Sequence, residues 1–157
     1  MTPTQLWQRY LKTHPQAADA LVSSYHFGDA KEEANAAVTR ICLGEKTGCI
    51  SFPQAFEAQG APCPQPGDYA VITDFAGNGI CIIQVLWVEE LSIEQAFPVY
   101  RRMDTLEQDR SAWEEKQYAI QKKLCEETGQ PWQEDLPVLL ESFRTVFKVK
   151  RVKVKQG

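Results

Sequence analysis

The spacing of apolar residues along the chain alternates between a helical and an extended pattern. Apolar residues three or four positions apart are typical of helices, and short β-branched or aromatic runs are typical of strands. We expect helical segments at residues 4–13, 15–23, 30–43, 53–59, 93–97 and 104–128 and strands at residues 47–52, 69–75, 80–88 and 138–154. This order predicts an α+β fold without regular strand–helix alternation.

Residues that favour helix ends and turns set several boundaries. Asp29 is the expected N-cap of the third helix, and Gly44 is expected to end it. Ser92 has the same capping role in a later short helix, and residues 76–79 combine glycine and asparagine as a hairpin turn does. The face expected to be buried on the longest helix carries Leu106, Trp113, Ile120 and Leu124.

The composition is that of a globular chain. The 157 residues are 43% hydrophobic and 24% charged, which excludes a disordered or coiled-coil chain and suits one domain. The nearly apolar run at residues 79–88 is too short to cross a bilayer, and no secretory signal is visible, so we expect a cytoplasmic protein without a membrane partner.

Charge is distributed unevenly. The net charge is −4, yet residues 148–157 contain five basic and no acidic residues. Bulk charge therefore argues against a general nucleic-acid binder and leaves a local basic stripe. The alternation of valine and lysine also suits the end of a last strand whose lysines discourage edge pairing.

Metal and cofactor motifs are missing from the sequence. The five cysteines form no close pair and the two histidines, His14 and His26, stand apart, so we expect reduced thiols, no structural metal and no cofactor. The sequence also contains no phosphate-binding glycine loop, no nucleophile elbow and no HExxH helix.

Lys46 is the first candidate functional residue. It lies on a tight connection between an expected helix end at Gly44 and an expected strand. A compact ammonium held there suits a phosphate or a polar base edge, although a solvated lysine after a helix end has the same spacing.

Two further segments carry possible chemistry. Tyr25 and Phe27, beside a glycine, are able to form a stacking wall for a base or to pack under the following helix. Asp109, Arg110 and Ser111 bring acid, base and hydroxyl together, or form a solvated helix face with a local ion pair.

These features occur in the order found in the ASCH domain, a PUA-like β-barrel, and the chain resembles bacterial ASCH proteins of about 150 residues. The resemblance rests on residues 25–29, 44–49, 64–68 and 141–146, and it covers residues 25–147 or more.

The resemblance implies one domain over residues 1–157. Its fold would be a small β-barrel decorated by N-terminal helices, with one long helix before the last strands. Residues 1–24 would be a helical extension, 25–149 the ASCH core and 150–157 a basic strand end or tail.

The function implied by the resemblance is recognition of RNA or of a modified nucleotide in a cleft beside the barrel. Lys46, Thr47 and Arg110 would contact phosphates or a base edge, and Tyr25 or Phe27 would stack on a base.

An enzyme is the alternative, either a ribonuclease or an amidohydrolase on an N4-acylated cytidine. In the amidohydrolase members a Lys, a Thr three residues later and a Glu before the long helix form the active group. Here Lys46 would stabilise charge, while Cys49 in place of the Thr, Ser111 and Glu107 are the candidate nucleophile or base. The expected Glu falls on Arg102 in one register and on Gln108, next to Glu107, in another. A non-catalytic interaction protein with a vestigial cleft is the third possibility.

Overall fold

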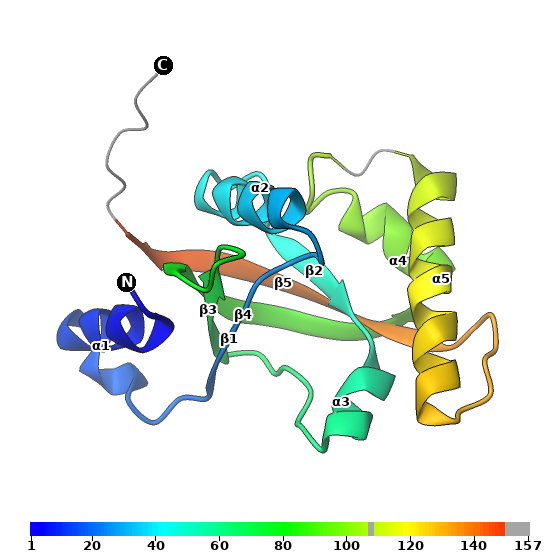
Figure 1. Cartoon of the computed structure of the whole chain (residues 1–157), viewed down its shortest axis with the longest axis horizontal. Helices are drawn as coiled ribbons and strands as arrows, with labels where there is room; N and C mark the ends of the chain where they lie inside the picture. Colours follow the sequence, from blue (N-terminus) through cyan, green and yellow to red (C-terminus); the bar gives the residue numbers. More distant parts are fainter. Residues whose placement is uncertain (107–108, 150–157) are drawn as a thin grey trace. The chain divides into compact units, whose positions relative to one another are not determined.

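The computed structural model describes residues 1–106 and 109–149. These residues contain five α-helices, one 3₁₀ helix and five strands (Figure 1). In chain order the elements are α1 (Pro3–Thr13), η1 (Pro15–Ala17), β1 (Val22–Tyr25), α2 (Lys31–Cys42), β2 (Gly48–Ser51), α3 (Pro53–Gln59), β3 (Tyr69–Thr73), β4 (Gly79–Ser92), α4 (Ile93–Tyr100), α5 (Arg110–Thr128) and β5 (Pro137–Lys148). The strands form a mixed sheet in the order β1-β3-β4-β5-β2, which confirms the α+β class. Closure of this sheet into a barrel stays a prediction.

The chain divides into two compact units. The first comprises Met1–Gly44, Gly67–Gln84 and the residues from Arg144 on, and the second comprises Glu45–Pro66 and Val85–Phe143. The two long strands β4 and β5 each contribute residues to both units.

In the first unit, α1 packs on strands β3 and β4. The helix begins with a capping box between Thr2 and Gln5, and its apolar face is buried with residues of both strands. β1 pairs in parallel with β3, and β3 pairs antiparallel with β4. The buried cluster of this unit is Leu6, Trp7, Tyr10, Ala17, Val71 and Ile82.

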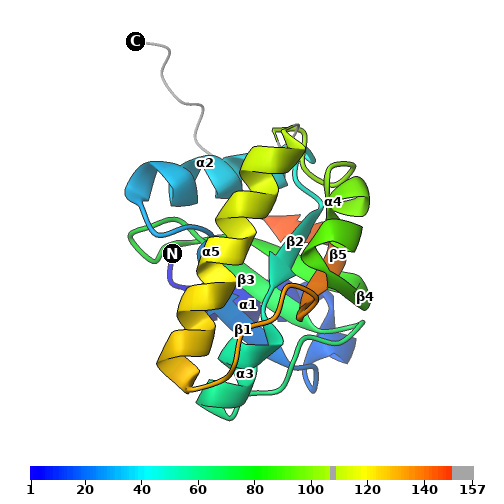
Figure 2. The ribbon, with the colours of Figure 1, turned by 90° about the vertical axis from the view of Figure 1, so that its right-hand side faces the viewer.

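In the second unit, α4 and α5 lie side by side, and the last turns of α5 lie beside α3 (Figures 1 and 2). β2 pairs antiparallel with β5. The buried cluster combines aromatic residues of the helices with residues of the strands: Phe52, Ile93, Ala96, Phe97, Tyr100, Trp113, Val138 and Leu140. This unit carries the candidate site.

One expected helix is largely absent. The segment 15–23 was expected to be helical, but only Pro15–Ala17 forms a 3₁₀ turn, and Val22 begins β1. Leu21 and Val22, the apolar residues at the end of this segment, are exposed. Backbone pairing with β3 provides the hydrogen bonds that local helical spacing was expected to provide.

Two helix starts also differ from the expectation. Ala30, not Asp29, is the N-cap of α2, and no side chain caps that helix. α5 begins at Arg110 with Asp109 as its capping side chain, so residues 104–106 precede it. Leu106, expected on the buried face, is 66% exposed.

The buried face of α5 agrees only in part with the expectation. Trp113 is buried and Leu124 packs against the core cluster, as expected, whereas Ile120 is 38% exposed. The other buried positions of the helix are Gln117, Gln121 and Cys125.

Other boundaries agree with the expectation. Ser92 caps α4 with a capping box, as predicted. The predicted last strand is confirmed as β5 through residue 148, and its expected part from residue 150 on lies outside the described residues.

Candidate functional site

Lys46 lies where two segments distant in the sequence run antiparallel. An isolated antiparallel β-bridge pairs Lys46 with Asp104. In the chain, Lys46 lies in the connection from α2 to β2, and Asp104 lies in the connection from α4 to α5. The Thr47 N–H donates to the Met103 oxygen at 2.7 Å, and the Thr105 N–H donates to the Glu45 oxygen at 3.2 Å. The backbone therefore fixes the position of the lysine from both neighbours.

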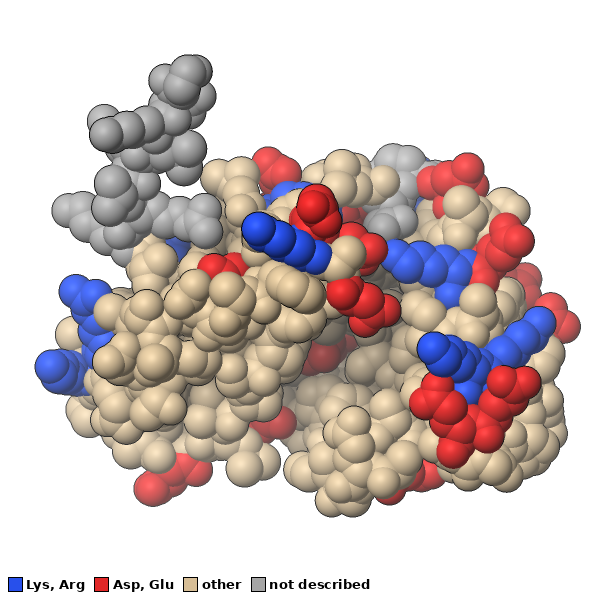
Figure 3. Space-filling model, in the orientation of Figure 1, with Lys and Arg blue, Asp and Glu red and all other residues tan. Residues whose placement is uncertain are grey.

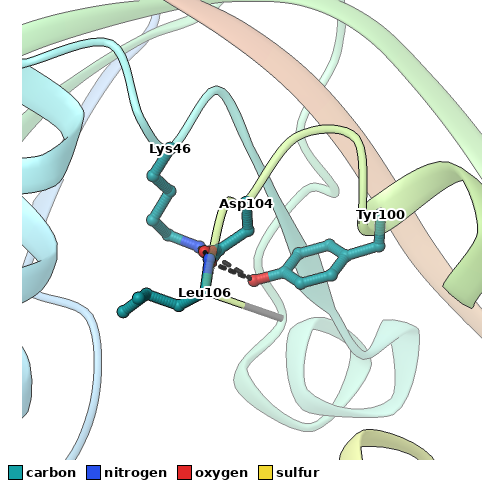
Figure 4. A network of polar contacts seen from close by, with 4 residues as sticks. All are labelled: Lys46, Tyr100, Asp104 and Leu106. Carbon is teal, nitrogen blue, oxygen red and sulfur yellow. Dashed lines mark hydrogen bonds and ion pairs between the residues drawn. The ribbon is translucent and has the colours of Figure 1, made fainter. Parts of the chain in front are cut away.

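The side chains of Lys46, Tyr100 and Asp104 form a compact polar group, called the Lys46 group below (Figure 4). The Lys46 ammonium donates to the Tyr100 hydroxyl at 3.0 Å and lies 3.3 Å from Asp104 Oδ2. The Tyr100 hydroxyl donates to the same Oδ2 at 3.0 Å. The backbone N–H of Leu106 donates to Oδ1 at 3.0 Å. The carboxylate thus accepts hydrogen bonds on both oxygens.

This ion pair is buried. The side chains of Lys46 and Asp104 are 7% and 3% exposed. Two charges withdrawn from water have a large desolvation cost, and their attraction offsets it only when the remaining hydrogen-bonding capacity is satisfied. Buried ion pairs of this kind occur in functional sites and in structural networks.

Cys49 lies next to this group but in a different pairing. It is opposite Glu141 in the β2–β5 ladder, and its thiol donates to Glu141 Oε1 at 3.1 Å. Burial and the Glu141 carboxylate raise the pKa of the Cys49 thiol well above its ordinary value, against a smaller opposing effect of the Lys46 ammonium. Cys49 is therefore a protonated hydrogen-bond donor rather than a thiolate.

Gly48, between the two candidates, is required by close packing. A Cβ at this position would meet the Met103 sulfur and would lie 2.8 Å from the backbone oxygen of Glu141. Because Gly48 has no side chain, the segment that carries Lys46 is able to approach both Met103, in the loop after α4, and Glu141 of β5.

The other expected site residues have different surroundings. Thr47 is exposed, and its backbone oxygen accepts from the Phe143 N–H at 2.9 Å. The Arg110 guanidinium donates to Glu114 Oε2 at 3.1 Å and to the backbone oxygen of Glu94 at 2.9 Å. The second bond links the start of α5 to α4. Ser111 is exposed on the first turn of α5.

Two expected site residues belong to the other unit, and a third lies outside the described residues. Tyr25 and Phe27 belong to the first unit, where their rings meet edge to face with centroids 5.3 Å apart. Glu107 lies outside the described residues.

Sequence reasoning missed Tyr100, Asp104 and Glu141. Asp104 is the acidic residue before α5 whose carboxylate meets Lys46, and the expected helix start at residue 104 obscured it. Its signal was an acidic residue shortly before the long helix, the region where the resemblance implies a Glu.

Two classes of site are absent from the described residues. Across residues 1–106 and 109–149, no group of three His, Cys, Asp or Glu side chains is placed to hold a metal ion. Among the helices of these ranges, none combines the length and apolar character that a membrane span requires.

One family model matches most of the chain, and solved structures share its fold. The family model described as the ASCH domain matches residues 23–147. The ASCH domain crystal structure from Lactobacillus crispatus JV V101 is 24% identical, with a TM-score of 0.77 over 92% of this chain and 94% of that one. A protein from Enterococcus faecalis V583 is 21% identical, with a TM-score of 0.80 over 93% and 88%. Among curated proteins, none matches the chain significantly.

Proposed function

The chain belongs to the ASCH domain family, and on this premise we propose that it binds RNA or a nucleotide-derived small molecule at the Lys46 group. ASCH domains are PUA-like and generally RNA-binding. The observation that carries the proposal is the meeting of an ammonium, a phenol and a carboxylate within 3.3 Å of one another.

The chemistry of this group favours a base edge over a phosphate. Within the group the ammonium donates, the carboxylate accepts and the phenol does both. A nucleobase, which carries neighbouring donors and acceptors, would replace some of these internal hydrogen bonds with its own. Asp104 neutralises the charge of Lys46, so the pair attracts a phosphate weakly. The preferred ligand is therefore an unpaired base or a modified nucleoside.

Ligand titration by calorimetry tests this proposal. The probes are cytidine, N4-acetylcytidine and a short single-stranded RNA, compared in wild type, Lys46→Met and Tyr100→Phe. We expect Lys46→Met to weaken binding at least about tenfold, because a lost charged hydrogen bond is worth about 1.5–3 kcal/mol. Tyr100→Phe keeps the ring and should weaken binding by less.

Two controls distinguish binding at the Lys46 group from nonspecific electrostatic attraction of the ligand to the protein. Lys116→Met removes an exposed lysine of α5 and should leave the affinity unchanged. Binding by a base edge should also depend weakly on salt, whereas phosphate contacts give a steep dependence. Equal affinities of Lys46→Met and Lys116→Met, with circular dichroism showing both folded, would refute the proposal.

A hydrolytic function is the second candidate, favoured by the carboxylate found before α5. The resemblance implies that amidohydrolase members use a Lys, a Thr three residues later and a Glu before the long helix. Lys46, Cys49 and Asp104 would take these three roles here, with a Cys in place of the Thr and an Asp in place of the Glu.

The chemistry would be addition of water to the acyl carbonyl of an N4-acylated cytidine. Asp104 would accept a proton from the water, and Lys46 would stabilise the oxyanion. Cleavage of the carbon–nitrogen bond, with the proton passed to the leaving nitrogen, would give a carboxylic acid and cytidine. Cys49, being protonated, would donate a hydrogen bond and would not attack.

Chromatography of N4-acetylcytidine incubated with the protein tests this candidate. Release of cytidine should be lost in Asp104→Asn and retained in Cys49→Thr. Release that persists in Asp104→Asn, or no release at all by a folded wild type that binds the nucleoside, would leave binding as the function.

A further inference from the structure

A hollow of about 670 Å³ lies on α5, apart from the Lys46 group. One side of it is the helix and the other is the segment that follows the helix. The lining residues that matter below are Glu114, Glu115, Tyr118, Lys122, Trp132 and Glu134. We call it the α5 hollow.

Two aromatic rings form perpendicular walls of the α5 hollow. The Tyr118 and Trp132 rings have centroids 6.0 Å apart and an interplanar angle of 85°. The Trp132 N–H donates to Gln121 Oε1 at 3.0 Å, and Gln121 Nε2 donates to the Leu136 oxygen at 3.1 Å. Gln121 is fully buried, so one interior amide holds the tryptophan wall in place.

A cation of the chain itself occupies the face of one wall. The Lys122 ammonium lies 4.5 Å from the centroid of the Trp132 ring. This distance is within the range of a cation–π interaction, and tryptophan is the best aromatic partner for a cation. The wall is therefore able to hold an ammonium, and an exposed flexible lysine is the group that does so here.

The charge around the walls is negative. Three carboxylates line the hollow, from Glu114, Glu115 and Glu134, against the single lysine among its lining residues. Burial and then the carboxylates of Glu114 and Glu134 raise the pKa of Tyr118. Arg110, paired with Glu114 at 3.1 Å, offsets part of this charge from outside the lining. Figure 3 shows acidic and basic side chains intermixed where α5 lies.

We propose that the α5 hollow binds a linear oligoamine, a flexible small molecule that carries two or more ammonium groups. One ammonium takes the place of Lys122 on the Trp132 ring, and another lies among the carboxylates. The volume is that of a small-molecule site and exceeds the need of one lysine side chain. Lys46, Tyr100 and Asp104 are not among the residues that line the hollow, so this site is separate from the proposed base recognition.

The test is a titration of the whole protein with spermidine, followed by NMR of the tryptophan indole N–H signals. The Trp132 signal is identified by its loss in Trp132→Phe. We expect spermidine to shift this signal, and Lys122→Ala to bind spermidine about two- to fivefold more tightly, because the competing internal cation is gone. Glu134→Gln should bind it more weakly.

The matched control is Lys123→Ala, which removes the same charge from the next exposed position of α5 outside the hollow lining. General attraction to an acidic protein would strengthen binding equally in Lys122→Ala and Lys123→Ala, and that result would overturn the proposal. It is also overturned if spermidine leaves the Trp132 signal unmoved. Binding of an oligolysine peptide without binding of spermidine would assign the hollow to a protein partner instead.

Discussion

Removal of the Asp104 charge should destabilise the second unit strongly. Asp104→Asn keeps the shape of the side chain and leaves the Lys46 ammonium buried opposite a neutral amide. One amide oxygen must then serve three donors that now use two carboxylate oxygens: the Lys46 ammonium, the Tyr100 hydroxyl and the Leu106 N–H.

The magnitude follows from burial. With side chains 7% and 3% exposed, solvent screens the pair little. Loss of one partner of a buried ion pair costs about 3–5 kcal/mol. Because Asp104→Asn retains part of the hydrogen bonding, we expect it to cost about 3 kcal/mol. Lys46→Met should cost a similar amount because it leaves the carboxylate without its cation.

Urea unfolding of wild type, the two single variants and the double variant measures the coupling between these residues. The double variant removes both charges, so its loss should be smaller than the sum of the single losses by at least about 1 kcal/mol. Strictly additive losses would refute the reasoning, since they would mean that the two charges act independently despite the 3.3 Å contact.

Three further predictions concern packing, titration and capping. Gly48→Ala should lower the free energy of unfolding by about 1–3 kcal/mol in urea, because its Cβ meets the backbone oxygen of Glu141. Native Cys49 should resist iodoacetamide in mass spectrometry. Burial raises the pKa of Cys49 in the folded state, so above pH 9 the thiol ionises more readily in the unfolded chain. The free energy of unfolding should therefore fall with rising pH more steeply in wild type than in Cys49→Ala. Asp109→Ala should cost about 1 kcal/mol in thermal unfolding, whereas Asp29→Ala should have little effect.

Elements with local signals at both ends were predictable from the sequence. α3 begins at Pro53 and ends at Gly60, which has a φ of 64°, and α4 begins at the capping side chain of Ser92. These signals act within one turn of backbone. Residues 104–106 lack such a signal. Because Leu106 is apolar and fits the helical spacing, the predicted helix began at residue 104, before the true start at Arg110. A bridge to Lys46, which is a tertiary contact, sets their conformation instead.

The same difference separates the residues of the site. Lys46 was recognisable because a helix end, a lysine and a strand follow one another within a few positions. Its partners Tyr100 and Asp104 lie 54 and 58 positions away, and Glu141 lies 92 positions from Cys49. Periodicity carries no information on such distances, so only the fold assembles these groups.

The buried side chain of Gln121 holds Trp132, one wall of the α5 hollow, in its position. Its buried amide accepts from the Trp132 N–H and donates to the Leu136 carbonyl, so the position of the tryptophan wall depends on a residue that does not line the hollow. Mutational drift at this interior position would leave two polar groups unsatisfied and release the segment, whereas drift at the exposed lining would change only its charge. The shape of the α5 hollow therefore depends on a buried residue, whereas its ligand selectivity depends on the exposed charged residues of its lining.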